Sequence, residues 1–457
     1  EVSTLIMKHT LEDYRSAILL SENDKIERRP RMLINNAFFK GQQFVAWSNS
    51  AKKLTEVRGQ HEPWQQQVAV NLFTPIGQTT TAKMTQNRPA MAAVPFTTEE
   101  EDVYKARVGS KILEWWWTEN NMSTTLHDNV LNAWLNGTGI FQWSWDDDLG
   151  PLIEVQKPGS IETEYRRLGM PRCDNVLAFD WGADPLASNA EDARFIYRIR
   201  VVLRSWIEKR FNKKVKSDME IRDELKHRSQ ESLIFTGDEG SGVLSDDYCT
   251  LFEFYGDGKY AYFTPTEMLD TGPWLQDYPF AIIRPIPGVG DIRNGRLSSG
   301  SIWGDTIANQ LTGLQRLLNR SMTRIAEIGD IHSQPRWLIP RTAKVLRKDF
   351  TTKPGGGIEW SGYGPPPREV APPGLPGYIV QMPEKIAKQM MDVSGIHEIS
   401  QGQSPGSIQS GRGLAILAEM DATKFGPFAR EIGAAIEKIG KNVLRLWQEN
   451  QTNSMTL

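Results

Sequence analysis

Residues 335–380 contain nine prolines and seven glycines, and they separate two stretches that have helical periodicity. Proline lacks a backbone N–H donor and glycine loses much entropy in regular structure, so no helix can run through such a segment. The segment is also basic, with seven Lys or Arg residues against three Asp or Glu. Long loops inside folded chains usually carry a function. The sequence therefore predicts two helices joined by a long, basic, non-helical excursion.

The helix before this excursion is the clearer of the two. Apolar residues recur three or four positions apart from Ile307 to Ile325, which is the spacing of one helical face. Ser298–Ser301 supply hydroxyl groups that favour a helix start. We therefore predict a helix over residues 298–330.

Three further elements follow the excursion. Helical periodicity returns in a stretch that we assign to residues 383–400, and a loop rich in Gly, Ser and Gln follows at 401–412. The remaining residues, 413–457, again read as helix. Gly426 and Pro427 lie inside this last stretch, and a proline there predicts a kink.

The first 297 residues mix helical and strand patterns. Helical spacing predominates over 10–57 and 100–136, and the triplet Trp115–Trp117 covers nearly the whole circumference of its helix, which must therefore be buried on several sides. Ile140–Asp146 alternates aromatic and polar residues as a strand does, and Tyr248–Phe263 reads as a hairpin. The predicted fold class is therefore α+β, with several domains.

Motifs for catalysis are missing from the sequence. It contains no P-loop, no GxSxG, no HExxH and no dinucleotide-binding fingerprint. Its six histidines are scattered, and two cysteines cannot build a four-cysteine zinc site. We therefore expect no catalytic activity, no metal and no cofactor. A metal-dependent nucleic-acid-processing enzyme stays a weaker alternative, for which the available carboxylates are Asp146, Asp147, Asp148, Asp180 and Asp184.

The charge balance limits the kind of partner. The chain has 53 basic and 56 acidic residues, which gives a formal net charge of -3. Proteins that grip nucleic acid over a large surface usually carry a basic excess, so any contact with DNA is expected to be local or loose. No run approaches the roughly 18 apolar residues of a membrane-spanning helix, so we expect no membrane partner.

A stripe of arginines marks the predicted helix over 298–330. Its members lie four residues apart on one face and are Arg316, Arg320 and Arg324. The stripe is either a solvated face, or a ring of guanidinium groups from several subunits that pairs with neighbouring carboxylates or faces phosphates. The acids that balance a solvated face are Asp305, Glu327 and Asp330.

Several stretches carry a resemblance to a known family. They are Arg31–Leu33, the sequence ASNAEDARFI at Ala187–Ile196, GRLSSGSIWGDTIANQLTGLQRLLN at Gly295–Asn319, and GQSPGSIQSGRGLAIL at Gly402–Leu417. In these segments and in the order of its elements, the chain resembles the portal proteins of tailed bacteriophages. No single stretch is diagnostic, but the order and spacing together are.

The resemblance implies a ring, usually of about twelve subunits, at one vertex of the capsid. Double-stranded DNA enters the capsid through the axial channel of such a ring and leaves the same way. Energy for packaging would come from a separate ATPase, since the chain has no nucleotide-binding motif. The implied domains are a wing (1–297), a stem helix (298–330), a clip (331–382), a second stem helix (383–400), a tunnel loop (401–412) and a long kinked helix leading to the crown (413–457).

Two sets of residues follow from these assignments. The tunnel loop would meet DNA through Gln403, Ser404, Ser407, Gln409, Ser410 and Arg412. Its polar character and single arginine suit weak contact, because each phosphate that is neutralised adds salt-dependent affinity. The clip would dock partners through Arg336, Trp337, Arg341, Lys344, Arg347, Lys348, Trp360 and Tyr363.

The implied partners are further copies of the chain, the terminase, the major capsid and scaffolding proteins, and the head–tail adaptor and tail proteins. The implied location is the portal vertex of the virion, after assembly in the host cytoplasm. Another head–tail structural protein or a minor capsid protein with the same helical pattern stays an alternative.

Overall fold

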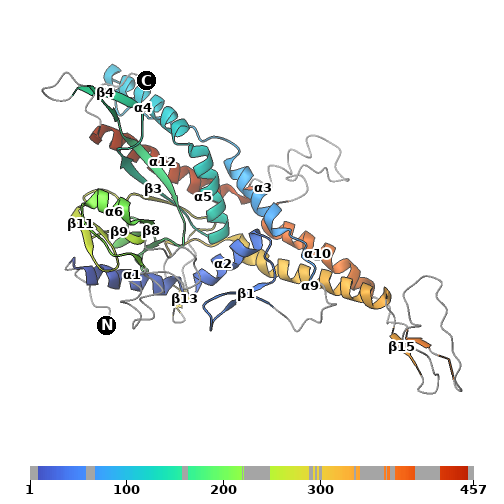
Figure 1. Cartoon of the computed structure of the whole chain (residues 1–457). Helices are drawn as coiled ribbons and strands as arrows, with labels where there is room; N and C mark the ends of the chain where they lie inside the picture. Colours follow the sequence, from blue (N-terminus) through green and yellow to red (C-terminus); the bar gives the residue numbers. More distant parts are fainter. Residues whose placement is uncertain are drawn as a thin grey trace. The chain divides into compact units, whose positions relative to one another are not determined.

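The structure is a computed structural model. It describes residues 9–57, 67–156, 163–218, 220, 247–287, 292–293, 296–297, 301–333, 336–339, 365–366, 368–370, 376–396 and 423–450. Helices and antiparallel sheets both occur, so the predicted α+β class is confirmed at that level (Figure 1). The chain divides into two compact units: unit 1 comprises residues 1–36, 77–309 and 398–457, and unit 2 comprises residues 37–76 and 310–397.

Unit 1 contains a five-stranded antiparallel sheet in the order β11-β10-β9-β8-β7. Asp257 and Gly258 join β9 to β10 with φ angles of 48° and 71°, the left-handed conformation that a two-residue hairpin turn needs. The predicted hairpin over Tyr248–Phe263 is thereby confirmed. The strands are β7 (Trp181–Ala183), β8 (Phe195–Leu203), β9 (Tyr248–Gly256), β10 (Lys259–Phe263) and β11 (Met268–Pro273).

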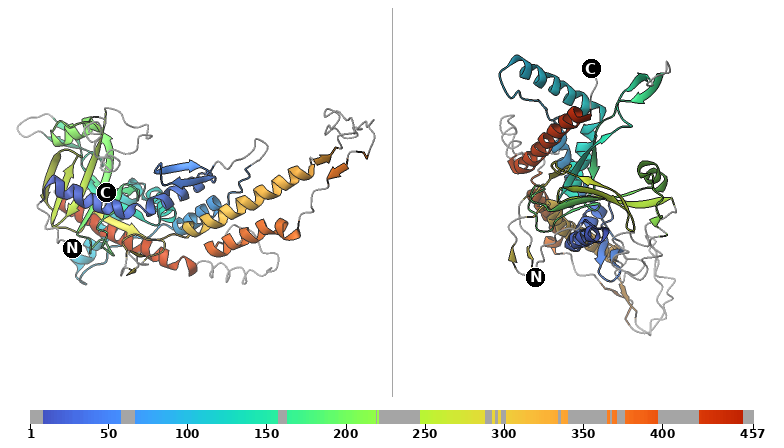
Figure 2. Two further views of the ribbon diagram at one scale, coloured as in Figure 1. Left: turned by 90° about the horizontal axis from the view of Figure 1, so that it is seen from below. Right: turned by 90° about the vertical axis from the view of Figure 1, so that its left-hand side faces the viewer.

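One face of this sheet is covered by α1 (Leu11–Lys25), as Figure 2 shows. Successive residues of a strand point to opposite faces. Phe195 and Tyr197 of β8 accordingly join the cluster with α1, whereas Ile196 between them joins the cluster on the other face. Tyr14 of α1 stacks on the ring of a β10 phenylalanine at 5.6 Å. The sheet is therefore buried on both sides.

A second sheet of unit 1 has the order β12-β3-β6, and three helices pack against one of its faces (Figure 1). Trp116 and Trp117 are buried in this core, and Trp115 is partly buried against it. The Trp116 indole donates to the Pro171 carbonyl at 2.6 Å. The prediction that the tryptophan helix is buried on several sides is confirmed. The elements are α4 (Glu100–Glu119), α5 (Met122–Asn136), β3 (Gly139–Asp146), β6 (Met170–Val176), β12 (Phe280–Ile283) and α12 (Gly426–Asn450).

Smaller elements complete unit 1. A hairpin pairs β4 with β5, and two short strands, β13 and β14, pair with each other. The helix α6 follows β8 directly, and α2 begins in unit 1 and ends in unit 2. Their bounds are α2 (Arg28–Phe39), β4 (Leu152–Gln156), β5 (Thr163–Arg167), α6 (Arg204–Phe211), β13 (Ile292–Arg293) and β14 (Arg296–Leu297).

Unit 2 is built around two helices, α9 and α10, which lie side by side in Figures 1 and 2. Two small antiparallel pairs accompany them, β1 with β2 and β15 with β16. The elements are β1 (Val45–Ser48), β2 (Lys53–Glu56), α3 (Phe73–Thr85, which continues into unit 1), α9 (Ile307–Ser333, which begins in unit 1), β15 (Arg336–Leu338), β16 (Arg368–Val370) and α10 (Gly377–Ser394).

Residues 10–57 were predicted to be largely helical, and the structure differs in the last part of this range. Gly41 adopts φ 84° directly after α2, and the Gln42 N–H bonds back to the Ala37 carbonyl at 2.8 Å, a pattern that ends a helix. The chain then forms the β1–β2 hairpin, in which Trp47 lies opposite Leu54. Its aromatic and β-branched residues suit strands better than a helix.

The predicted helix over 298–330 begins later, at Ile307. Backbone groups just before it are bound elsewhere in unit 1: Ile302 N–H donates to the Ala187 carbonyl at 3.0 Å, and Asp305 forms an antiparallel bridge with Ile286. These groups cannot also make helical hydrogen bonds. The hydroxyl of Thr306 accepts from the Ala308 N–H at 3.1 Å and caps the helix instead of the earlier serines.

The two later helices also differ from their predicted bounds. The helix predicted over 383–400 begins at Gly377, so Pro383 lies inside α10 rather than at its start. Gly395, with φ 72°, ends it in the usual left-handed cap. Within the part of 413–457 that the structure describes, α12 begins at Gly426 after a turn at Phe425, so its proline sits in the first turn, where an N–H is not needed.

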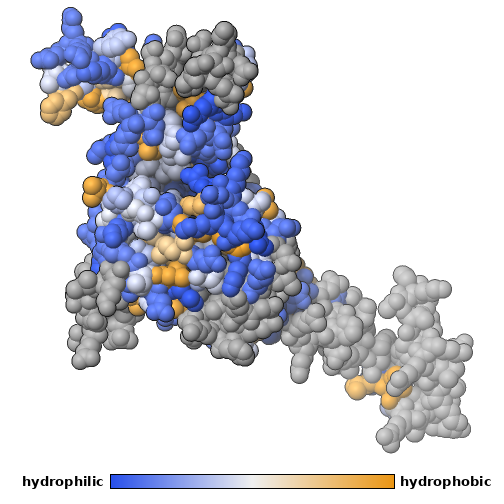
Figure 3. Space-filling model, turned by 60° about the vertical axis from the view of Figure 1, so that its left-hand side comes forward, coloured by the Kyte–Doolittle hydropathy of each residue, from blue (hydrophilic) through white to orange (hydrophobic). Residues whose placement is uncertain are grey.

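The surface in Figure 3 is mostly hydrophilic, with apolar side chains in small patches. None of the helices in the described ranges combines the length and the apolar character that crossing a bilayer requires. The most exposed large apolar side chains include Phe96 at 99%, Leu275 at 92% and Val94 at 85%.

Candidate functional surfaces

A ladder of polar side chains on α9 binds an extended segment of unit 2, residues 68–73. Gln315 accepts from the Leu72 and Phe73 N–H groups at 3.1 and 3.2 Å and donates to the Val70 carbonyl at 2.6 Å. Asn319 accepts from the Val70 N–H at 3.1 Å. Gln315 and Asn319 thus make the hydrogen bonds that a neighbouring strand would otherwise make to this extended backbone.

The next residue of the ladder, Thr323, accepts from the Val68 N–H at 3.1 Å. Residues four apart on a helix are about 6 Å apart along its axis, and residues two apart on a strand span about 6.6 Å. The spacing of Gln315, Asn319 and Thr323 therefore matches that of alternate residues in the extended segment. Sequence reasoning missed this ladder because it followed only apolar spacing along α9.

The arginine stripe shares α9 with the ladder but divides into two kinds of residue. Arg316 is used within unit 2: its guanidinium donates to the Val45 carbonyl at 3.2 Å and lies 5.4 Å from the centre of the Phe38 ring. Arg320 and Arg324 are exposed and make no ion pair with any described residue. Two of the three arginines of the stripe are therefore open either to solvent or to a partner.

The predicted clip is described only at its two ends. Arg336, Trp337 and Leu338 form β15, which pairs with β16 in antiparallel register, Arg336 opposite Val370. This pairing brings the start and the end of the Pro/Gly-rich segment together. The remaining predicted docking residues lie outside the described residues: Arg341, Lys344, Arg347, Lys348, Trp360 and Tyr363. The same holds for the whole predicted tunnel loop, with Gln403, Ser404, Ser407, Gln409, Ser410 and Arg412.

Unit 1 carries an apolar groove of about 560 Å³ between α4, the C-terminal part of α12 and the extended residues 93–96. Phe96 and Tyr104 line it and are 99% and 67% exposed. Trp115 and Trp447 form part of its wall, with ring centres 6.0 Å apart. A contiguous exposed apolar surface of this kind is typical of a protein–protein contact.

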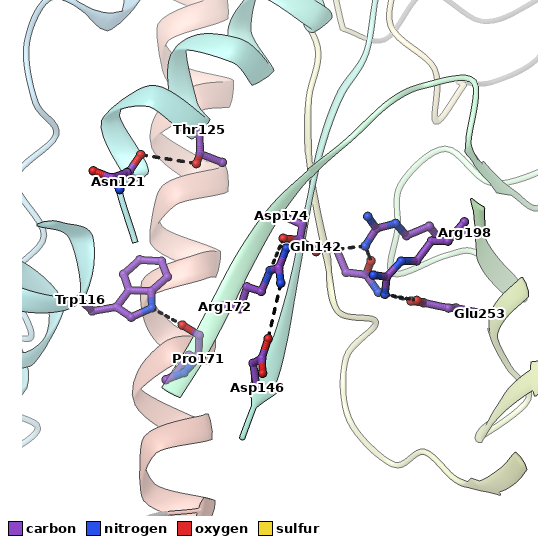
Figure 4. A network of polar contacts seen from close by, with 11 residues as sticks. Trp116, Asn121, Thr125, Gln142, Asp146, Pro171, Arg172, Asp174, Arg198 and Glu253 are labelled. Atoms are coloured by element: carbon purple, nitrogen blue, oxygen red, sulfur yellow. Dashed lines mark hydrogen bonds and ion pairs between the residues drawn. The ribbon is translucent and has the colours of Figure 1, made fainter. Parts of the chain in front are cut away.

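A polar network in unit 1 occupies the region between its two sheets (Figure 4). Gln142 of β3 donates to Glu253 of β9 at 2.7 Å and accepts from Arg198 of β8. Glu253 also pairs with Arg200 at 2.9 Å. Gln142 and Glu253 are 5% and 4% exposed, so their polar atoms need these partners. The network ties the sheets together.

The same network continues along β6 (Figure 4). Arg172 lies between two carboxylates, with 2.6 Å from its Nε to Asp174 and 3.5 Å from a terminal nitrogen to Asp146. The charged residues of this network are paired with one another, as in a structural ion-pair network.

Three of the aspartates considered for a metal site, Asp146, Asp147 and Asp184, have separate partners. Asp147 accepts from the Trp145 indole at 2.9 Å, and Asp184 pairs with Arg194 at 2.5 Å. Burial by itself raises the pKa of Asp184, but the Arg194 guanidinium and a backbone N–H outweigh it and lower that pKa. Burial raises the pKa of Asp180. The described residues contain no group of three His, Cys, Asp or Glu side chains placed to hold a metal ion.

The two cysteines are both buried. Burial raises the pKa of Cys249 to about 12, and burial raises the pKa of Cys173 as well. A nucleophilic cysteine needs a thiolate at neutral pH. Neither thiol meets that requirement.

Comparison with known proteins adds no family assignment, because no protein-family profile and no curated protein sequence matches the chain.

Proposed function

We propose that this chain is the subunit of a ring-forming phage portal, which provides the axial channel for packaging and ejecting double-stranded DNA and docks the terminase and the head–tail adaptors. One arrangement carries the proposal: the Pro/Gly-rich segment is bracketed by α9 and α10 and its ends are paired by β15 and β16. A helical stem with a small β element at its tip is what the resemblance implies for a stem and clip.

Two features of the surface support assembly. The groove beside Phe96 exposes apolar area that a monomer would leave in water, and burying it is favourable at about 25 cal/mol per Å². Arg320 and Arg324 are guanidinium groups without a partner among the described residues, and paired guanidiniums are common where subunits meet. In a monomer, the groove would stay in contact with water and the two guanidinium groups would gain no carboxylate partner from another subunit.

The first test is the mass of the purified protein in solution, by native mass spectrometry with negative-stain imaging of the same sample. The expected result is a ring with a central hole and a mass of about twelve times that of the chain, which is 51.7 kDa. A discrete dimer or tetramer without a hole would contradict the proposal.

The arginine stripe gives a variant for the same assay. Arg320→Glu with Arg324→Glu is expected to shift the protein toward smaller species, because reversing two charges at a contact makes it repulsive. A matched control reverses Lys209 and Arg210, two exposed basic residues of α6 in unit 1. If both variants form rings equally well, α9 does not contribute to the contact between subunits.

The tunnel loop is tested by measuring both ring assembly and DNA packaging. Deleting Gly402–Arg412 is expected to leave the ring assembled while impairing DNA packaging or retention. Loss of the ring on deletion would refute the assignment of this segment to the channel.

A further inference from the structure

A dense basic stretch runs through α6 and the residues after it. Six Lys or Arg residues and one acid, Glu208, occur between positions 204 and 216. This stretch lies in unit 1, apart in sequence from the arginine stripe of α9. The basic residues are Arg204, Lys209, Arg210, Lys213, Lys214 and Lys216.

This stretch packs against the five-stranded sheet of unit 1. Ile207 of α6 and Val215 beyond it are 0% and 2% exposed and join a cluster with Leu251 and Leu269 of the five-stranded sheet. Phe211 packs its ring 5.6 Å from that of Tyr262. With one side fixed on the sheet, the basic residues of the helix are presented on the other.

The basic residues differ in whether they already bind a partner within the chain. Arg204 pairs with Glu208 at 3.2 Å, and Lys213 donates to two carbonyls of β11, that of Leu269 at 2.7 Å. Lys209, Arg210 and Lys214 are exposed and have no ion pair with the part of the chain that the structure describes. Three cations are therefore available to a partner.

A hollow of about 450 Å³ opens beside them, lined by Arg204, Lys214, Val215, Lys216, Glu220 and Glu267. Of its two acids, Glu220 already accepts from the Ser217 N–H at 2.9 Å. Basic groups outnumber acids along its wall. The hollow thus carries a small excess of basic groups, one of which, Arg204, is paired with Glu208.

The surroundings of an exposed tryptophan indicate which kind of polyanion can bind beside it. Trp206 is 39% exposed, and the guanidiniums of Arg200 and Arg210 lie 5.7 and 5.6 Å from its ring centre. Proteins that bind single strands use open aromatic faces as platforms for unpaired bases. The indole here is engaged by guanidiniums instead, and stacking holds the Arg210 fork in place for bonding to phosphate oxygens.

We infer that α6 and residues 212–216 form a sequence-independent binding surface for the phosphate backbone of double-stranded DNA, separate from any contact made by α9. Lysine and arginine contacts to phosphate position a duplex without reading its bases. The near-neutral net charge of the whole chain is compatible with a local basic surface, because acids elsewhere offset it, some of them paired with arginines of unit 1 such as Arg172, Arg194 and Arg198.

The test is the salt dependence of binding to a fluorescent 30-base-pair duplex of random sequence, measured by anisotropy on the full chain. Each phosphate contact contributes about 0.9 to the slope of log K against log salt. Three free cations therefore contribute a slope of about 2.7, which weakens binding about 40-fold between 50 and 200 mM salt.

The diagnostic variant is Lys209→Gln with Arg210→Gln, which is expected to reduce the slope by about 1.8. A matched control, Arg107→Gln with Lys111→Gln, removes two exposed cations four residues apart on α4 and is expected to leave the slope unchanged. Circular dichroism of each variant verifies folding. An unchanged slope in the α6 variant, or equal losses in both variants, would overturn the inference.

Competition identifies the class of partner. Poly-glutamate that binds while the duplex does not would assign the surface to an acidic protein, and tighter binding of a single strand would contradict the role given to Trp206. The mass of each sample is recorded in parallel. If the protein forms no rings but the α6 variant still lowers the salt slope, only the portal proposal is refuted. If rings form but the α6 variant leaves the salt slope unchanged, only this inference is refuted.

Discussion

Replacing Gln315 with leucine tests the ladder that fixes residues 68–73 on α9. Gln315 is 0% exposed, and leucine has nearly its volume, so packing changes little. The substitution removes the hydrogen bonds to the Leu72 N–H, the Phe73 N–H and the Val70 carbonyl. At about 1 kcal/mol for each bond, the segment loses about 3 kcal/mol of local stability.

Hydrogen exchange of a peptide spanning residues 67–76 measures this loss directly. A change of about 3 kcal/mol in the opening free energy corresponds to roughly 150-fold faster exchange at the protected amides. Global unfolding is a poorer readout, since chains with several units seldom unfold in two states.

Two further variants isolate the cause. Gln315→Glu keeps an acceptor for the two N–H groups but puts a buried carboxylate oxygen against the Val70 carbonyl and Asn319 Oδ1, so its exchange is expected to be at least as fast as that of Gln315→Leu. Gln310→Leu changes an exposed glutamine of the same helix and is expected to have no effect at residues 67–76. Protection in Gln315→Leu within threefold of the wild type would refute the reasoning.

The remaining predictions concern the core of unit 1. Asp184→Asn should lower stability at pH 7 and flatten its loss below pH 5, because the pKa of Asp184 is depressed in the folded state and its contribution disappears as pH falls through that value; urea titrations at several pH values measure this. Cys249 should resist a thiol reagent at pH 7 until the protein is unfolded, since burial raises its pKa to about 12. Trp116→Phe should cost about 2 kcal/mol in thermal or urea unfolding, through the lost bond to the Pro171 carbonyl and the space left behind.

Local sequence signals predicted local structure well. The hairpin over β9 and β10 follows from a Gly-Asp-Gly turn whose backbone conformation is set by the residues themselves. The helix with Trp115–Trp117 follows from an apolar pattern so broad that only burial on several sides accommodates it. In both cases the deciding information lies within about ten neighbouring residues.

The errors share a physical origin in distant contacts. The start of α9 is set by bonds from residues 302–306 to partners such as Ala187 and Ile286, which no local pattern announces. The ladder residue Gln315 bonds to backbone 242 to 245 positions away. Arg316 belonged to a regular stripe in sequence, yet the carbonyl of Val45 in a hairpin predicted as helix engages it. A periodic pattern identifies a face, but it does not say what covers that face.

Ion pairing distinguishes the basic residues that stabilise this fold from those that are available to partners. In unit 1, Arg172, Arg194 and Arg198 are bound to carboxylates of neighbouring strands and loops, so replacing them would leave those carboxylates without their partners. Lys209 and Arg210 on α6, and Arg320 and Arg324 on α9, have no such role among the described residues, so their replacement should spare the fold. Because the two pairs lie in different units, reversing one should affect DNA binding and reversing the other assembly. If both variants lost both properties together, a single shared contact would explain the two surfaces better than two separate ones.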